Sequence, residues 1–290
     1  MTVLNIRHRT TYRYREPVRL GPHRLMLRPR ESRDVRLLSS KLEMTPAAPL
    51  SWTTDVFGNA VATAGFAVLA DELAVESRAT VELDASPWPV FDIAASAIHY
   101  PFFYSSEERT DLGALAVPQT FDASGRLAEW SRGFVRGERT DTLALLKDMA
   151  TGVAAGIGYQ SREAEGTQTP LQTIDRGWGS CRDFAVLFAE VARCLGFGAR
   201  IISGYLYNPD RAPAPEGSAM GAGSTHAWAE IFLPGAGWIT FDPTNRAVGG
   251  YNLIPLAVGR VIAQVMPMTG TFLGMTDAYL GMSVDVEVTP

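Results

Sequence analysis

The sequence predicts an α+β fold with an antiparallel β-sandwich-like N-terminal part, a mixed core of helices and strands, and a C-terminal β-strand tail. Apolar residues alternate with period two in the first hundred residues, follow helical spacing in the middle of the chain, and alternate again at its end. At 290 residues the chain is long enough for about two domains. We expect a β-rich domain over residues 1–115, a core over residues 120–250, and a tail over residues 251–290 that packs on one of the two.

The N-terminal part is predicted to consist of half-buried strands joined by turns. Apolar and aromatic side chains alternate with arginines from Leu4 to Tyr14, and a similar alternation runs from Leu73 to Leu83. The segment from Asp55 to Asn59 contains turn residues between strands. The arginines of this region indicate a solvated sheet face, with an anionic docking surface as the alternative.

A linker and a first helix are expected next. Pro87 and Pro89 interrupt any strand pattern, because proline donates no ladder hydrogen bond, so we place a linker from there to Pro118. Thr140 or Asp141 can cap a helix whose apolar residues recur at helical spacing.

A second helix and a set of strands complete the core. After a loop at Gly166 to Pro170, the helix is predicted to begin at Cys181 and to end at Gly196. The segment from Pro209 to Gly223 is a loop by composition. The expected strands are Arg200 to Tyr207, His226 to Leu233 and Trp238 to Phe241, with a turn at Pro234 to Gly237 and a last strand around Val284, Val286 and Val288.

Composition and charge narrow the classes of function. The chain is 46% hydrophobic and 20% charged, as is usual for globular proteins. Its net charge of -5 offers no general attraction for phosphate backbones, so we expect no nucleic-acid partner. No stretch approaches the roughly 18 apolar residues of a membrane span, and the start lacks an apolar signal segment. We therefore expect a cytoplasmic protein without a membrane partner, whose two cysteines stay thiols.

Cys181 is the first candidate for chemistry, because it stands at the predicted start of a helix. A tight segment with two glycines, Gly177 to Ser180, leads into it. Backbone N–H groups and the positive end of the helix dipole stabilise a thiolate there and lower a thiol pKa of about 8.5 toward neutrality. The alternative is a small buried core residue, which is our interpretation of Cys194, placed in the middle of the same helix.

His226 and Asp242 are expected to lie near each other. His226 opens a strand after a glycine-rich loop, and Asp242 ends the antiparallel partner strand, so a short hairpin brings them to the same end. The imidazole can take the thiol proton, and the carboxylate can hold the imidazole in one tautomer. Each residue alone also has a structural interpretation, which for Asp242 is a turn before Pro243.

Metal binding is a further interpretation of the same residues. Cys181, His226 and Asp242 are all competent zinc ligands, but a structural zinc site usually has four protein ligands in closely spaced pairs. The sequence has no C-x-x-C or H-x-x-x-H pair and no spacing typical of a calcium-binding EF-hand. We therefore expect no metal and no cofactor.

These segments resemble the bacterial transglutaminase-like family. The resemblance rests on Gly-Ser-Cys-Arg-Asp-Phe-Ala at 179–185, His-Ala-Trp-Ala-Glu at 226–230 and Phe-Asp-Pro-Thr-Asn at 241–245, in this order. The stretches 7–14 and 55–59 are similar to the family's N-terminal β-domain. The resemblance implies a papain-like transglutaminase core in which Cys181 is the nucleophile, His226 the general base and acid, and Asp242 the orienting carboxylate.

The resemblance also implies cysteine-dependent acyl transfer on a peptide or protein amide. Hydrolysis by a thiol protease or amidase is the leading hypothesis, and protein-glutamine transamidation or peptide modification is the enzymatic alternative. A non-catalytic scaffold that binds peptide is the third hypothesis. The oligomeric state stays open.

The oxyanion that develops in such a reaction needs hydrogen-bond donors. The Cys181 N–H at the helix start is the first of them. Papain supplies a glutamine six residues before its cysteine, where this sequence has Asp175. We therefore take Tyr159 as the substitute donor and Trp178 as a further oxyanion or substrate residue.

Overall fold

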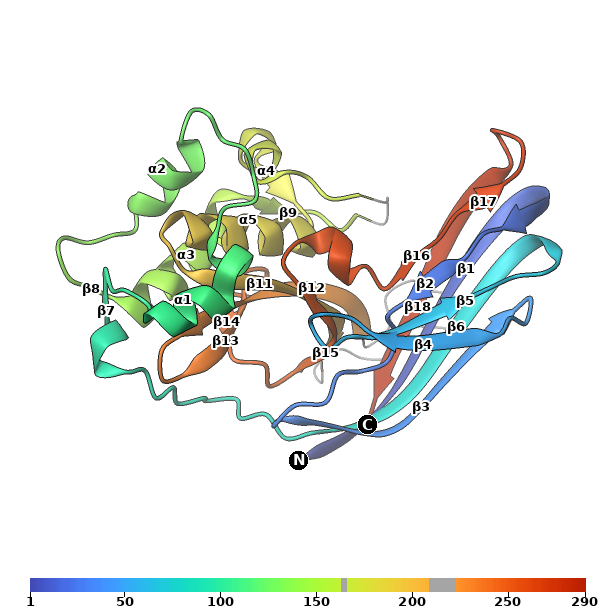
Figure 1. Ribbon diagram of the computed structural model, residues 1–290, viewed down its shortest axis with the longest axis horizontal. Coiled ribbons are helices and arrows are strands. Elements are labelled where there is room, and N and C mark those ends of the chain that lie inside the picture. The colour runs from blue at the N-terminus through green and yellow to red at the C-terminus, as the bar shows by residue number, and fades with distance from the viewer. Residues whose placement is uncertain (163–165, 209–222) are drawn as a thin grey trace.

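The chain forms two lobes (Figure 1). One is built from antiparallel strands, and the other from helices packed on a sheet of its own. The structure, a computed structural model, describes residues 1–162, 166–208 and 223–290. The loop expected from Pro209 to Gly223 therefore lies outside the described residues, apart from Gly223, which begins a strand. The predicted α+β class is confirmed.

The N-terminal lobe is a sandwich of two antiparallel sheets. One has the strand order β17-β1-β6-β3 with β18 also beside β1, and the other has the order β16-β2-β5-β4. One buried apolar cluster contains side chains from both sheets, so the core of this lobe lies between them. The strands are β1 Thr2–Leu20, β2 His23–Leu25, β3 Val35–Thr45, β4 Leu50–Thr54, β5 Ala60–Ala64, β6 Leu69–Leu83, β16 Met268–Thr269, β17 Phe272–Leu273 and β18 Tyr279–Thr289.

The arginines of β1 lie opposite carboxylates of the neighbouring strands. Arg7 forms ion pairs with Glu76 of β6 and Asp285 of β18. Arg13 pairs with Glu72, also on β6. These surface and partly buried pairs balance the positive charge of the β1 arginines, which supports a solvated sheet face over an anionic docking surface.

The second lobe is built around helix α5 and a five-stranded sheet with the order β14-β13-β12-β11-β15. Helix α5 packs on β11 and β12, and α2, α3 and α4 pack on α5, so α5 lies at the centre of this lobe (Figure 1). The helices are α1 Ser106–Leu112, α2 Arg126–Arg132, α3 Thr142–Gly156, α4 Pro170–Arg176 and α5 Cys181–Cys194. The sheet strands are β11 Gly198–Tyr207, β12 Gly223–Leu233, β13 Gly237–Asp242, β14 Ala247–Val248 and β15 Leu253–Gly259, and two short pairs join β7 His99–Tyr100 to β8 Thr140–Asp141 and β9 Gly158–Tyr159 to β10 Trp178–Gly179.

The helices begin where the sequence supplies capping residues. Asp141 accepts a hydrogen bond from the Ala144 N–H and caps α3. The segment expected to be a linker contains helix α1, whose start is capped by reciprocal hydrogen bonds between Ser105 and Glu108. The sequence does not predict α2 and α4, because each has only seven residues, too few for a clear helical period.

The C-terminal segment contributes strands to both lobes. Strand β15 adds to the edge of the core sheet beside β11, whereas β18 runs antiparallel to β1 of the sandwich. The domain boundaries expected at 1–115, 120–250 and 251–290 stay a prediction.

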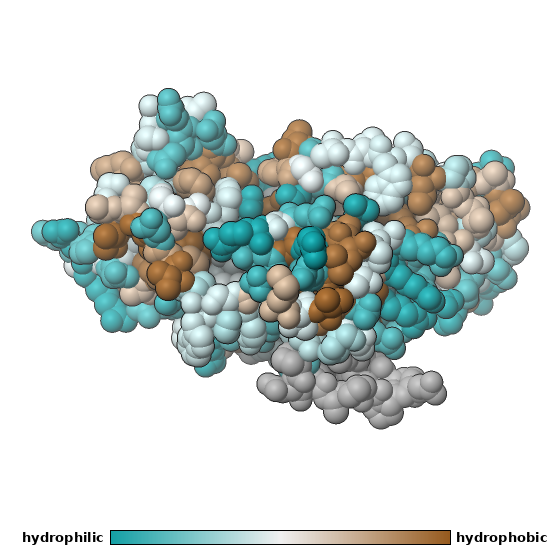
Figure 2. Space-filling view, turned by 90° about the horizontal axis from the view of Figure 1, so that it is seen from below, coloured by the Kyte–Doolittle hydropathy of each residue, from teal (hydrophilic) through white to brown (hydrophobic). Residues whose placement is uncertain are grey.

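Large apolar side chains on the surface are scattered over separate elements. Among the most exposed are Trp88, Val90, Phe103 and Phe121. On the face shown in Figure 2, apolar residues likewise form separate patches between hydrophilic ones. Within the described part of the chain, no helix has both the length and the apolar character that crossing a membrane requires.

Candidate active site

Cys181 occupies the first position of α5, as the sequence predicts. The segment before it is strand β10, which pairs in parallel with Gly158 and Tyr159. A Cβ added to Gly179 would lie 2.9 Å from the Asp183 Cβ, so glycine allows the chain to turn closely into the helix. The thiol therefore lies at the positive end of α5, where the first N–H groups have no partner within the helix.

Asp183 fixes the backbone at the start of α5. It is fully buried and accepts hydrogen bonds from the N–H and the Oγ of Ser180 at 2.7 and 2.8 Å. The Gln168 N–H and the Arg162 guanidinium also donate to this carboxylate. These donors offset the burial of its charge and hold the residues next to Cys181. The Ser-x-x-Asp spacing is a capping signal from which the role of Asp183 could have been predicted.

His226 and Asp242 lie on the antiparallel strands β12 and β13. The Nε2–H of His226 donates to Oδ2 of Asp242 at 2.8 Å, since an ionised carboxylate can only accept. Both side chains are almost fully buried. The imidazole also hydrogen-bonds to the thiol of Cys181. Because Nε2 faces the carboxylate, Nδ1 is the ring nitrogen left to face the sulfur.

Asn245 supports the carboxylate from the turn that follows β13. Its Nδ2 donates to Oδ2 of Asp242 at 2.6 Å and lies 3.5 Å from Nε2 of His226. The backbone N–H groups of Thr244 and Asn245 donate to Oδ1. From the sequence alone, Asn245 has no role beyond its place in the 241–245 motif. An asparagine three residues after an aspartate at a turn is the sequence signal from which this role could have been predicted.

Burial opposes ionisation of all three side chains, and their mutual contacts outweigh it. Desolvation acts to raise the pKa of Cys181, but the hydrogen bond and charge of His226 bring that pKa below its usual value. Desolvation acts to lower the pKa of His226, but Asp242 and Cys181 raise it. The pKa of Asp242 is lowered because His226 and Asn245 offset its burial. Each shift favours the charged form of its group relative to the isolated side chain, which is the thiolate, the imidazolium and the carboxylate.

Tyr159 and Trp178 lie beside the segment that leads into Cys181. Tyr159 pairs with the second residue of β10, is 53% exposed, and its ring meets that of Phe184 edge-on. Trp178 is half-buried, and the Arg176 guanidinium lies 5.8 Å above its ring. The structure thus brings both near the thiol-bearing turn. Their roles in oxyanion or substrate binding stay predictions.

Two other positions considered in the sequence lie outside this arrangement. Asp175, at the place of the papain glutamine, is exposed and forms an ion pair with Arg126 at 2.5 Å. Cys194 is the last residue of α5 rather than a mid-helix residue, because the turn at Leu195 ends the helix there. Burial raises the pKa of Cys194 to about 11, so it is a poor nucleophile at neutral pH.

The candidate triad forms a line rather than a ring of ligands. The imidazole of His226 hydrogen-bonds to the carboxylate through Nε2 and also to the thiol. Zinc ligands instead converge on one ion. Over the described ranges, no three His, Cys, Asp or Glu side chains are placed to share a metal. The linear arrangement suits proton transfer between neighbours.

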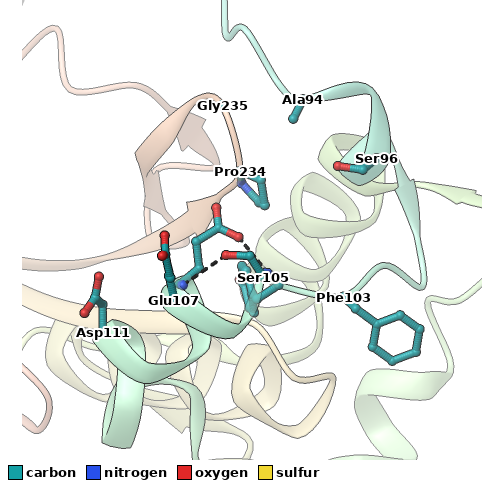
Figure 3. A pocket seen from close by; sticks show the side chains of 10 residues that line it. Ala94, Ser96, Phe103, Ser105, Glu107, Asp111, Pro234 and Gly235 are labelled. Atoms are coloured by element: carbon teal, nitrogen blue, oxygen red, sulfur yellow. Dashed lines mark hydrogen bonds between the residues drawn. The ribbon is translucent and has the colours of Figure 1, made fainter.

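An open pocket of about 650 Å³ lies at the other end of the hairpin, between α1 and the turn that joins β12 to β13 (Figure 3). Pro234 and Gly235 of that turn line it together with Ser105 and Glu107. His226 lies seven residues before the end of β12, which is about 23 Å along an extended strand. The pocket is therefore separate from the triad.

Comparison with protein families identifies both halves of the chain. Residues 4–82 match the bacterial transglutaminase-like N-terminal region, and residues 128–243 match the transglutaminase-like superfamily. An uncharacterized protein of Mycobacterium tuberculosis is 27% identical over 97% of this chain and 91% of its own length. An uncharacterized protein of Mycobacterium leprae is 24% identical over 98% of both chains.

Two further similarities concern proteins whose names refer to an activity. A crystal structure of a putative cysteine protease from Cytophaga hutchinsonii has the same fold, with a TM-score of 0.74 and 19% identity over 98% of this chain and 89% of that chain. A protein-glutamine gamma-glutamyltransferase of Pseudomonas aeruginosa is 28% identical over 100 residues, which are 34% of this chain and 14% of that protein. The first family match contains the stretches 7–14 and 55–59, and the second contains the segments around Cys181 and His226. The chain thus belongs to the transglutaminase-like superfamily and carries a bacterial transglutaminase-like N-terminal region before its core.

Proposed function

We propose that this protein is a thiol enzyme that transfers the acyl group of a peptide or protein amide through Cys181, His226 and Asp242. The observation that carries the proposal is the imidazole held between a buried carboxylate and a thiol at a helix start. Burial alone raises a thiol pKa, as it does for Cys194. The lowered pKa of Cys181 is the opposite result and supports a nucleophilic thiolate.

The proposed cycle begins with attack of the Cys181 thiolate on the amide carbonyl carbon. A C–S bond forms, and the carbonyl oxygen takes the negative charge near the Cys181 N–H. The C–N bond then breaks, and the amine leaves with the proton of the His226 imidazolium. The neutral imidazole next takes a proton from the attacking water or amine. That attack breaks the C–S bond and restores the thiolate and the imidazolium.

Hydrolysis and transamidation differ only in the acceptor of the acyl group. We propose hydrolysis as the main outcome, in a reducing compartment such as the cytoplasm, where both cysteines stay thiols. The similarity to the Pseudomonas aeruginosa glutamyltransferase favours transamidation as the second candidate. Neither cycle requires a metal or cofactor.

Turnover of a peptide-amide library, with and without an added primary amine, separates the two outcomes. Mass spectrometry is expected to show free acids as the main products, whereas adducts of the amine would favour transamidation. Cys181→Ala should lower the rate by roughly 10³-fold or more, by analogy with other nucleophile deletions. Cys194→Ala is the matched control and should retain full activity.

Two results would contradict the proposed activity. One is a Cys181→Ala protein that still turns over the same peptides at the wild-type rate. The other is a folded wild-type protein that binds peptides from the library without cleaving or modifying any of them. The second result would favour the peptide-binding scaffold.

A further inference from the structure

The hairpin turn between β4 and β5 fastens the N-terminal lobe to the core sheet (Figure 1). The side chain of Asn59 is fully buried. Its Nδ2 donates to the Val258 carbonyl at 2.7 Å, and its Oδ1 accepts from the Val258 N–H at 2.9 Å. Val258 belongs to β15, an edge strand of the core sheet. The amide therefore pairs with this edge as a neighbouring strand would.

The turn itself is held in one shape. Asp55 accepts hydrogen bonds from the N–H groups of Phe57 and Asn59. Gly58 has a φ of 74°, a conformation that favours glycine. The Arg30 guanidinium donates to the Phe57 carbonyl and to Oδ1 of Asn59. These bonds fix the direction in which the Phe57 side chain leaves the turn.

Phe57 packs against a small apolar cluster on the core sheet. The cluster contains Ile202, Trp228, Leu253 and Val258, which lie on β11, β12 and β15. It is separate from the main core clusters of the two lobes. Phe57 is half-buried and comes from the N-terminal lobe, whereas the four residues of the cluster belong to the core sheet.

Trp228 connects the cluster to the candidate active site. It is 2% exposed, and its ring is stacked with that of His226, with centroids 6.1 Å apart and planes 29° apart. The two residues are neighbours on one face of β12, because side chains alternate along a strand. Asp242 holds the imidazole by one nitrogen, and Trp228 limits how the ring can tilt.

We infer that Phe57 is a positioning residue for His226, acting through Trp228, and that the N-terminal lobe thereby forms part of the catalytic apparatus. Removing the Phe57 ring would leave a void beside the cluster and allow Trp228 to shift. The imidazole would then lose its fixed place between Cys181 and Asp242. This inference rests on the proposed function of His226.

The test compares full-length wild type, Phe57→Ala and Phe57→Leu by the rate of Cys181 alkylation with iodoacetamide from pH 5 to 9. In the wild type, the apparent pKa of Cys181 should lie well below about 8.5, the value of a free thiol. Phe57→Ala should move it toward that value and lower the alkylation rate at pH 6 by roughly tenfold or more. Phe57→Leu retains most of the apolar volume and should restore most of the wild-type profile.

Two matched controls separate positioning from general stability. Leu73→Ala truncates a buried side chain in the sandwich core of the same lobe. It should lower Tm at least as much as Phe57→Ala without moving the pH profile. Val56 lies in the same turn and is 93% exposed, so Val56→Ala should change neither Tm nor the profile.

The outcomes distinguish this inference from the proposed function. A wild-type Cys181 that reacts like a free thiol would overturn the proposed function, and the inference with it. A wild-type thiolate whose profile is unchanged in folded Phe57→Ala would overturn the inference alone. Where Phe57→Ala does not fold, Phe57→Leu and Phe57→Val take its place. An apparent Cys181 pKa that rises in Phe57→Leu and rises further in Phe57→Val supports positioning. Two variants with the same pH profile as the wild type contradict it.

Discussion

His226 keeps its proton because Asp242 accepts a hydrogen bond on one side of the ring and the sulfur of Cys181 lies on the other. The reactive ion pair exists only at pH values above the thiol pKa and below the imidazole pKa. The first is lowered from about 8.5 and the second is raised from about 6.5. Activity should therefore follow a bell-shaped pH profile whose plateau extends from the lowered thiol pKa to the imidazole pKa of about 10.

Asn245→Ala removes one of the donors that hold the Asp242 carboxylate. We expect kcat/KM to fall roughly tenfold, because the net value of one hydrogen bond is about 1.4 kcal/mol. The pKa of Asp242 should rise toward its ordinary value of about 3.9. A pH–rate profile measures both effects. Arg246→Ala changes the exposed neighbouring residue and serves as the control, and wild-type kinetics in Asn245→Ala would contradict the role.

The sequence predicts the three chemical groups of the site but not the groups around them. Cys181, His226 and Asp242 stand out because their residue types carry known chemistry and follow turns and strand ends. Asp183 and Asn245 act only through hydrogen bonds to neighbours, and the same residue types occur at many ordinary caps and turns. The roles of these two residues follow only from the hydrogen-bond distances in the structure.

At the scale of elements, Gly204 sets the fit between β11 and the strands on either side. It pairs with His226 on β12. An added Cβ would lie 2.1 Å from the Ile254 carbonyl oxygen on β15 and 2.6 Å from the Trp228 ring. A backbone oxygen in an edge pair cannot move away without breaking the ladder, so the strands must part. Glycine is required here for close packing rather than for its φ.

Gly204→Ala should lower the free energy of unfolding by about 1–3 kcal/mol, as overpacking usually does. Denaturant unfolding monitored by tryptophan fluorescence measures the change. Gly65→Ala is the matched control, because nothing lies within 4 Å of a Cβ added there and its stability should be unchanged. Equal stability of both variants would show that the strands adapt freely at Gly204.

The elements differ in how well the sequence predicts them. The alternation in β1 and β6 and the apolar stripe of α5 continue over many residues, and the predicted starts of α3 and α5 agree with the structure. The seven-residue helices α1, α2 and α4 present too few turns for a period to emerge. Residues that can cap a helix, such as Ser105 and Thr169, also occur in linkers, so they do not predict these helices by themselves.

At the scale of the whole molecule, contacts between the lobes are the part that no sequence pattern predicts. Asn59 pairs with the backbone of Val258, and Phe57 packs on the cluster around Trp228, although about 200 and 170 residues separate these partners along the chain. The turn chemistry of 55–59 predicts a hairpin and gives no information about what it touches. The role of the N-terminal lobe beside the active site follows only from the fold.

His8 links the same two lobes and makes their contact sensitive to acid. Its Nδ1 lies 2.9 Å from the Tyr205 hydroxyl on β11, and its Nε2 lies 3.0 Å from Oγ1 of Thr10. Burial lowers the pKa of His8 to about 4. An unfolded chain binds that proton near pH 6.5. Stability that is present above pH 6.5 is therefore lost as the pH falls toward 4, by up to about 3 kcal/mol.

His8→Gln should be less stable than wild type at pH 7 and should lose less stability between pH 7 and pH 4.5, because it carries no titrating group. Denaturant unfolding at the two pH values measures the difference. His99→Gln, on the short strand β7 of the other lobe, should retain the wild-type dependence on pH. If wild type and His8→Gln lose the same free energy of unfolding between pH 7 and pH 4.5, His8 is not the cause of the acid sensitivity.

The central claim is tested most directly by alkylating Cys181 across pH 5 to 9 in wild type and His226→Ala, with Cys194 as the internal reference. Wild-type Cys181 should react well below pH 8.5, and His226→Ala should abolish this reactivity, because burial remains while the charge partner is lost. Cys194 should stay nearly unreactive throughout. A Cys181 that reacts only above pH 8.5, or a profile unchanged by His226→Ala, would contradict the thiolate–imidazolium pair.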